Sequence, residues 1–228
     1  MMQAALLALS AGAIEAPATM PGPTAAKVVD TAEVERRPGR WFVRAGALRA
    51  LYNSSARITT NGSIIPGSTA GVTDSTTLTF DIGYDLSDDI SVMVMGGIPP
   101  SVDVIGQGSV SSFGKLGRVR FGPAVATAVY RLQAWRNFRP YVGAGAAHLF
   151  ILKTEDRSVK DLKVQDHNGF VAQAGVEYRL SRKWELYADY KHIWLNVHAR
   201  GTLAGAPVRA NVTLDPDVIS AGVKFHFD

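Results

Sequence analysis

The chain has 228 residues, of which 46% are hydrophobic, 19% are charged and 22 are glycine. This composition excludes a disordered chain, a collagen-like repeat and a long coiled coil, and it favours a core made of β-strands. The net charge is only +4 and the basic residues are interleaved with 20 acidic ones, so we expect no nucleic-acid partner. Because the chain has no cysteine, disulfides, thiol nucleophiles and cysteine-ligated zinc are also excluded.

Residues 1–18 predict a secretory signal peptide, since a short apolar run precedes the small-residue motifs Ala11-Gly12-Ala13 and Ala16-Pro17-Ala18. A short N-terminal helix is the alternative interpretation. Residues 19–40 contain three prolines and a charged cluster, which predicts a periplasmic tether with little fixed structure.

The rest of the chain has no segment that could cross a membrane as a helix. The longest stretch without Asp, Glu, Lys or Arg is 16 residues, Ile58 to Thr73, and it is rich in Gly, Ser and Thr. A membrane-spanning helix needs about 20 mostly apolar residues. A closed β-barrel is the other structure that satisfies every backbone polar group within a bilayer. If this chain spans a membrane, it therefore does so as a barrel.

From Trp41 onward, the sequence contains eight segments of roughly ten residues in which polarity repeats at every second position, as in transmembrane barrel strands. In Thr76–Tyr84, for example, Leu78, Phe80 and Ile82 alternate with threonine, aspartate and glycine. In Leu116–Tyr130 we expect the small alanines to face inward, whereas the faces of Arg139–Phe150 are ambiguous. The eight segments are Trp41–Tyr52, Thr76–Tyr84, Ile90–Ile98, Leu116–Tyr130, Arg139–Phe150, Asn168–Arg179, Trp184–Val197 and Pro216–Phe227.

The connections between these segments alternate between short and long, which is typical of an outer-membrane barrel with short periplasmic turns and longer extracellular loops. We therefore predict an all-β fold, an eight-stranded antiparallel transmembrane β-barrel over residues 41–228, in the outer membrane of a Gram-negative bacterium. Aromatic residues collect at the short-turn ends and predict an interfacial girdle. Its expected members are Trp41, Tyr84, Tyr141, Tyr178, Trp184, Phe225 and Phe227.

Several of these segments resemble the OmpW family of outer-membrane proteins. The resemblance rests on Trp41-Phe42-Val43-Arg44-Ala45-Gly46, Arg139-Pro140-Tyr141-Val142-Gly143-Ala144-Gly145, Gln173-Ala174-Gly175-Val176-Glu177-Tyr178 and Leu214-Asp215-Pro216 before the last strand. It implies a barrel with a hydrophobic lumen that passes small hydrophobic solutes from outside and releases them laterally into the membrane. Barrels of this kind usually end on an aromatic residue that serves the barrel-assembly machinery, whereas here Asp228 follows Phe227.

Strand parity predicts a charge network on the inner face of the periplasmic half, in which we expect Glu177 and Glu185 to balance Arg44 and Lys224. Such a network could seal the lumen or simply stabilise the barrel. Its expected members are Arg44, Asp81, Glu177, Glu185, Asp189, Lys191 and Lys224. Nearer the external end, four inward residues are candidates for an apolar channel lining, namely Leu48, Met93, Met95 and Ile193, although Arg118 and Arg120 argue against a wholly apolar wall.

Motifs for catalysis or metal binding are missing from the sequence. The five histidines have no metal-ligand spacing, and neither a nucleophile elbow nor a phosphate-binding glycine loop is present. We expect no metal, no cofactor and no enzymatic activity, and we expect partners to be outer-membrane lipids, the assembly machinery and small hydrophobic solutes. Two alternatives to a channel remain: a structural or adhesive barrel whose loops bind phage, bacteriocin or host surfaces, and a lipid-modifying enzyme.

Overall fold

A computed structural model describes residues 40–133 and 135–227, which form an antiparallel β-barrel. The signal peptide and almost all of the tether predicted above lie outside the described residues. Among the residues described, no helix is long and apolar enough to cross a membrane. The strands are β1 Trp41–Tyr52, β2 Ser55–Thr60, β3 Ser63–Ile64, β4 Ser68–Val72, β5 Ser75–Asp85, β6 Ile90–Gly97, β7 Ser101–Gly108, β8 Lys115–Arg131, β9 Phe138–Asp156, β10 Val159–Val164, β11 His167–Arg179, β12 Trp184–Trp194, β13 Asn196–Leu203, β14 Ala206–Thr213 and β15 Pro216–His226.

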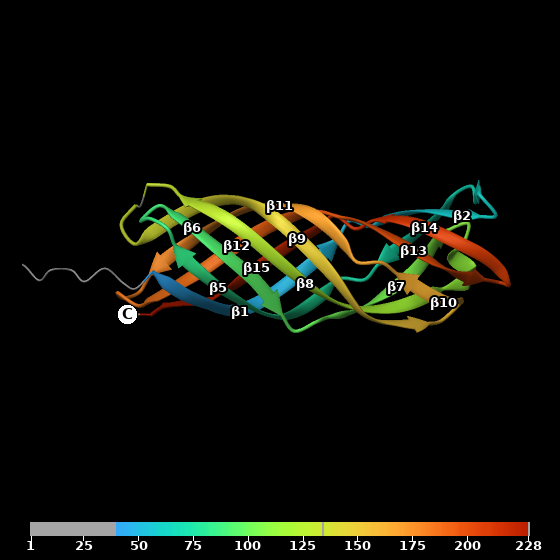
Figure 1. Ribbon diagram of the computed structural model, residues 1–228, viewed down its shortest axis with the longest axis horizontal. Helices are drawn as coiled ribbons and strands as arrows, with labels where there is room; N and C mark the ends of the chain where they lie inside the picture. Colours follow the sequence, from blue (N-terminus) through green and yellow to red (C-terminus); the bar gives the residue numbers. More distant parts are fainter. Residues whose placement is uncertain (1–39, 134, 228) are drawn as a thin grey trace, which may run out of the picture. The chain divides into compact units, whose positions relative to one another are not determined.

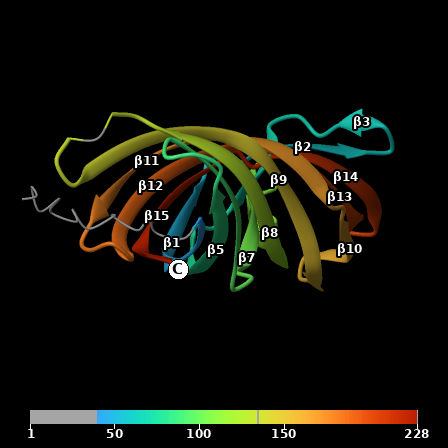
Figure 2. The same ribbon diagram turned by 60° about the vertical axis from the view of Figure 1, so that its left-hand side comes forward.

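Eight of these strands close the barrel in the order β8-β6-β5-β1-β15-β12-β11-β9, and β9 pairs with β8 again. The prediction of an eight-stranded antiparallel barrel is confirmed (Figures 1 and 2). The short turns β5–β6, β8–β9 and β11–β12 lie at the end of the barrel that also carries the C-terminus, at the left of Figure 1. This is the periplasmic end of an outer-membrane barrel.

The alternation along each strand separates the lipid face from the lumen. On β5, the side chains of Leu78, Phe80 and Ile82 are each about half exposed, while Thr79 and Asp81 between them are buried. Neighbouring strands repeat the pattern in register, for instance Ala45 opposite Phe80 and Arg44 opposite Asp81. This register places polar groups inside the barrel and apolar groups against lipid. A shift by one residue would exchange the two faces, so the contrast between them selects the register.

The predicted long loops contain strands of their own. The segments between the barrel strands form β2, β3, β4, β7, β10, β13 and β14, and five of these strands make a second sheet in the order β10-β13-β14-β2-β3. Strands β8 and β9 continue past the barrel into the same region, at the right of Figure 1. We call this region, residues 53–74, 101–120, 153–166 and 195–215, the extracellular extension. Its strands keep the period of two, since Val208 and Val212 are buried and Arg209 between them is exposed.

The face prediction for β8 was wrong. Val119, Phe121, Val125 and Val129 face the lumen and are buried, whereas the alanines between them face lipid. Both faces of this strand are apolar, so hydrophobicity could not distinguish them. Arg118 and Arg120 therefore also lie on the outer face, and they leave the lumen at this height apolar.

Outward aromatic residues form the predicted girdle at the periplasmic end. Trp41 packs on Tyr84 with ring centroids 5.0 Å apart, and Trp184 packs on Phe225 at 4.8 Å. Phe227 extends this group through its edge contact with Phe225, and Tyr178 packs on Phe138.

Tyr141 does not belong to this girdle, because its side chain points into the lumen and is only 2% exposed. A second set of outward aromatics, which sequence reasoning missed, lies toward the external end at Phe150, Phe170 and Trp194. Trp184 and Trp194 are ten residues apart on β12, which at about 3.3 Å per residue and a tilt of about 40° spans roughly 25 Å, the height of an apolar membrane band.

Candidate functional site

A network of charged side chains fills the periplasmic half of the lumen. Arg44 on β1 lies opposite Asp81 of β5 on one side and Lys224 of β15 on the other. Its Nε is 3.2 Å from Asp81 Oδ2, and its guanidinium stacks on the ring of Tyr187 at 3.5 Å from the centroid. All of these charged side chains are less than 5% exposed. The network therefore forms a buried polar plug across the lumen.

Asp189 is the centre of the plug. Its Oδ2 accepts hydrogen bonds from Arg44 and from Tyr141 and Gln173, the last two at 3.0 Å. Its Oδ1 accepts from Lys191 Nζ and from Ser220, both at 2.7 Å. Five donors from five strands thus converge on one carboxylate, which explains how two cations are tolerated side by side in a buried place.

A second cluster lies nearer the periplasm around Glu177. Lys224 Nζ is 2.8 Å from Glu177 and 3.1 Å from Glu185, and the Nε of Arg131 donates to Glu177 at 3.0 Å. Arg131 also reaches Asp85 at 2.9 Å, and Asp85 pairs with His226 at 3.2 Å. The chain of ion pairs and hydrogen bonds therefore crosses the bore from β8 through β11 and β15 to β5.

The structure brings together all seven residues that the sequence predicted for the charge network, but one of the expected pairings is wrong. Glu177 and Glu185 both pair with Lys224, whereas Arg44 pairs with Asp81 and Asp189. Arg44 rises from β1 toward the middle of the bore, where Asp189 is closer than either glutamate. Sequence analysis missed three members, Asp85, Arg131 and His226. Asp85 and Arg131 lie one residue beyond the predicted segments, although both continue the inward parity of their strands.

Above the plug the lumen becomes apolar. Leu48, Met95 and Ile193 line a cavity of about 690 Å³, a volume that includes the part open to solvent. Met93, the fourth predicted lining residue, lies lower: its sulfur accepts a hydrogen bond from Arg44 at 3.3 Å, and its side chain packs with Phe42, Val129 and Tyr141. Met93 is thus part of the plug rather than of the apolar lining.

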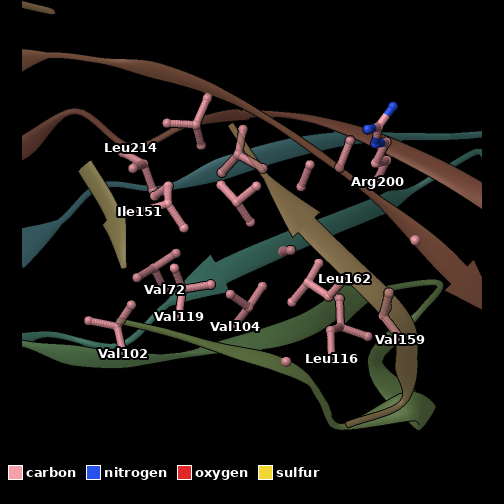
Figure 3. A pocket seen from close by; sticks show the side chains of 18 of the residues that line it. Val72, Val102, Val104, Leu116, Val119, Ile151, Val159, Leu162, Arg200 and Leu214 are labelled. Atoms are coloured by element: carbon pink, nitrogen blue, oxygen red, sulfur yellow. The ribbon is translucent and has the colours of Figure 1, made fainter. Parts of the chain in front are cut away.

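A second apolar cavity, of about 920 Å³ including its open part, lies inside the extracellular extension. Figure 3 shows the aliphatic side chains that surround it, among them Val102, Leu116, Ile151 and Leu162. Tyr52, Phe121, Leu149 and Leu214 line both cavities. The two cavities are therefore adjacent, and they form an apolar path above the plug with these four side chains between them.

The lower cavity also reaches the barrel wall between β6 and β8. These strands pair from Ile90↔Tyr130 to Met95↔Val125, and the β-ladder resumes between β7 and β8 at Ser101↔Arg120, beside one hydrogen bond from the N–H of Phe121 to the carbonyl of Pro100 at 3.3 Å. We call the interval, residues 96–100 and 121–124, the seam. Gly96, Gly97, Pro100 and Pro123 of the seam line the cavity together with lumen residues. Because proline has no N–H to donate, a gap in the hydrogen-bond ladder costs less here than elsewhere in the wall.

Charged residues of the extracellular extension form local ion pairs away from the apolar path. Arg118 and Lys115 both bind Asp103 at 2.8 Å and hold the pKa of this carboxyl well below its ordinary range. Asp156, at the turn after β9, accepts the backbone N–H groups of Leu162 and Asp161, and these bonds also lower its pKa. Both carboxylates stabilise loops of the extension.

Comparison with known proteins agrees with this arrangement. The family model described as the OmpW family matches residues 37–227. The chain belongs to the OmpW family. Among its relatives are the dibenzothiophene metabolism operon protein PahQ of Pseudomonas aeruginosa, 31% identical over 82% of this chain and 88% of the relative, and the outer membrane protein AlkL of Ectopseudomonas oleovorans, 30% identical over 73% and 72%.

Solved structures of two other outer-membrane proteins show the same fold. The crystal structure of OprG from Pseudomonas aeruginosa matches with a TM-score of 0.77 at 22% identity, covering 84% of this chain and 97% of OprG. The structure of AlkL in lipid bilayers matches with a TM-score of 0.66 at 25% identity, covering 94% and 96%. This OmpW-family protein is accordingly an outer-membrane β-barrel of a Gram-negative bacterium.

Proposed function

We propose that this protein is a passive channel that takes small hydrophobic molecules from outside the cell and releases them sideways into the outer membrane. The observation that carries the proposal is the change of the lumen from an apolar path to a closed, buried ion network. A solute that reaches Leu48 and Ile193 from outside meets the plug at Arg44 and Asp189 below it. Passing an apolar solute through the plug would break buried ion pairs, which costs several kcal/mol each.

The seam supplies the lateral exit. Gly96 and Pro123 line the lower cavity and belong to the stretch of wall where β6 and β8 are not paired. Ile98 of this stretch lines the lower cavity and is about half exposed, so it is a side chain that a leaving solute must move aside. The name of PahQ, which refers to dibenzothiophene metabolism, fits a small apolar aromatic solute. We therefore propose that substrates are compact aromatic or aliphatic molecules without charge.

The experiment is uptake of the fluorescent apolar probe N-phenylnaphthylamine by Gram-negative cells that express the protein. We expect faster uptake than in cells with an empty vector. Gly96→Trp should slow uptake, since no atom lies within 4 Å of a Cβ at this position and the indole can occupy the seam. The matched control is Ala126→Trp, on the lipid face of β8 where the strand is paired with Val94.

Two results would contradict the proposal. If the native protein does not accelerate uptake although it is folded by heat-modifiable gel mobility, a structural or adhesive barrel becomes the better interpretation. If both tryptophan variants slow uptake equally, the solute does not leave through the seam.

A further inference from the structure

Three cations stand in one row on the outer face of the extracellular extension. Lys163 of β10 is paired in register with Arg200 of β13, and Arg200 is paired with Arg209 of β14. Residues directly opposite each other on antiparallel strands point to the same side of a sheet. All three are exposed, although Arg200 also borders the apolar cavity that Val208 and Leu203 line. In Figure 3 the guanidinium of Arg200 points away from the labelled apolar side chains. We call these three residues the cationic row.

Like charges directly opposite each other destabilise a sheet, so this arrangement needs a counter-charge. Within the described part of the chain, no side chain of the cationic row forms an ion pair or a hydrogen bond. Three other cations of the extension do have acidic partners: Lys115 pairs with Asp103, and Lys153 and Arg157 both pair with Glu155. Arg57, Arg120 and Lys160 are also unpaired among the described residues, but they are not in register with the cationic row. An anion that binds from outside the chain would therefore neutralise the repulsion between the three unpaired charges.

The row lines an open polar groove of about 1130 Å³. Thr59, Asn61 and Thr202 contribute hydroxyl and amide groups to it, and Asp161 is the one acidic residue among its lining. Net charge in the groove is thus +2, with neutral hydrogen-bonding groups between the cations. Such a mixture suits an anion attached to hydroxyl-bearing sugars, since the cations can bind the charge while threonine and asparagine bind hydroxyls.

The height of the row identifies the source of the anion. Arg200 follows Trp194, a member of the external aromatic set, by six residues, which places it about 15 Å above the apolar band. The outer leaflet of this membrane consists of lipopolysaccharide, whose phosphorylated core sugars occupy the layer directly above the acyl chains. We propose that the cationic row binds phosphate groups of the lipopolysaccharide core and so fixes the extracellular extension in the leaflet.

The test measures the affinity of the full-length, detergent-folded protein for lipopolysaccharide. Three probes are compared: intact lipopolysaccharide, the same material after chemical removal of its phosphates, and inorganic phosphate alone. We expect binding of the intact form, and binding of the dephosphorylated form that is weaker by on the order of tenfold or more, since three exposed charge pairs are lost together. Inorganic phosphate that binds as tightly as the lipid would overturn the lipid assignment and indicate a site for the free ion.

The deciding comparison is between two triple variants with the same loss of charge on the same side of the membrane. The row variant is Lys163→Gln, Arg200→Gln and Arg209→Gln, and the control variant is Lys115→Gln, Lys153→Gln and Arg157→Gln. We expect the row variant to bind intact lipopolysaccharide roughly tenfold more weakly than the native protein. The control variant, whose three cations already have acidic partners, should bind nearly as the native protein does.

A stability measurement separates loss of the site from misfolding. Because the row variant removes repulsion, its melting temperature without lipid should equal or exceed that of the native protein. Equal loss of binding by both variants would show that only net charge matters, and native affinity of the row variant would show that the row is not the site. Either result overturns the inference, and neither depends on whether the protein transports solutes.

Discussion

Replacing Asp189 with asparagine tests the polar plug at the residue on which most of its hydrogen bonds converge. The change keeps the shape of the side chain but removes the charge that Arg44 and Lys191 share. Arg44 retains Asp81, whereas Lys191 has no other ion-pair partner within the described part of the chain and is 1% exposed. Removing one partner of a buried pair typically costs 3–5 kcal/mol, roughly, and we expect a loss of unfolding free energy in this range.

Two companion variants assign the loss to the unpaired charge. Ser220→Ala removes one neutral donor from Asp189 and leaves four others, so its cost should be about 1 kcal/mol. Adding Lys191→Met to Asp189→Asn removes both charges of the broken pair and should recover most of the lost stability, because buried pairs can often be replaced by apolar residues at little cost.

The assay is urea unfolding of the barrel in lipid vesicles, followed by tryptophan fluorescence. A loss below about 1 kcal/mol for Asp189→Asn would mean that water reaches the plug and screens its charges. Failure of Lys191→Met to restore stability would show that the loss came from altered hydrogen bonding or packing. In either case the argument for a closed periplasmic end would lose its physical basis.

Three further predictions concern the wall, the C-terminal strand and the extension. Phe80→Arg, near the middle of the lipid face, should destabilise the barrel by about 2–4 kcal/mol in vesicle unfolding, whereas Leu86→Arg at the periplasmic turn should cost about 1 kcal/mol or less. Deleting Asp228 alone should leave the outer-membrane yield unchanged or higher, and deleting Phe227 as well should lower it, if the terminal aromatic serves assembly. The pKa of Asp156 is lowered by backbone N–H donors, so its contribution to stability is present above its ordinary value of about 4 and is lost as pH falls through the folded value. In NMR spectra, the chemical shifts of the two amide protons that Asp156 binds should change with pH only below about pH 4, and Asp156→Asn should abolish this change.

The barrel strands were predictable because the membrane forces a strict contrast between their faces. On β12, Trp184 and Leu186 alternate with Glu185 and Asp189, and the contrast fixes both the strand and its orientation. Where lumen and lipid are both lined by apolar groups, as on β8, the contrast vanishes. The inward face of Val125 and the outward face of Ala126 then depend on the register with β6 and β9, which no local pattern contains.

The extracellular strands were missed for a different reason. Their hairpins carry glycine and polar residues at turns, such as Ala204-Gly205 between β13 and β14, and these segments are typical of loops when considered alone. Their alternation becomes meaningful only because β8 and β9 extend beyond the membrane and offer a template for pairing. The thickness of the membrane therefore determines how much of each strand faces lipid, but it does not determine where the strands end.

On two neighbouring strands the inward side chains change from polar to apolar above the plug. On β12 the change falls between Lys191 and Ile193, and on β15 it falls between Ser220 and Val218, whereas Thr77 and Thr79 of β5 remain polar beside the lower cavity. Water is poorly stabilised in an apolar cavity, because it finds no hydrogen-bond partners there. The apolar cavities above the plug are therefore better suited to apolar solutes than to water. A charged or strongly polar solute would have to shed its hydration before it could reach the plug, where most of the charged groups are already paired with one another. If the protein is the channel that we propose, its selectivity should depend on this boundary between apolar and polar walls more than on the width of the bore, and the same boundary should direct an apolar solute toward the seam.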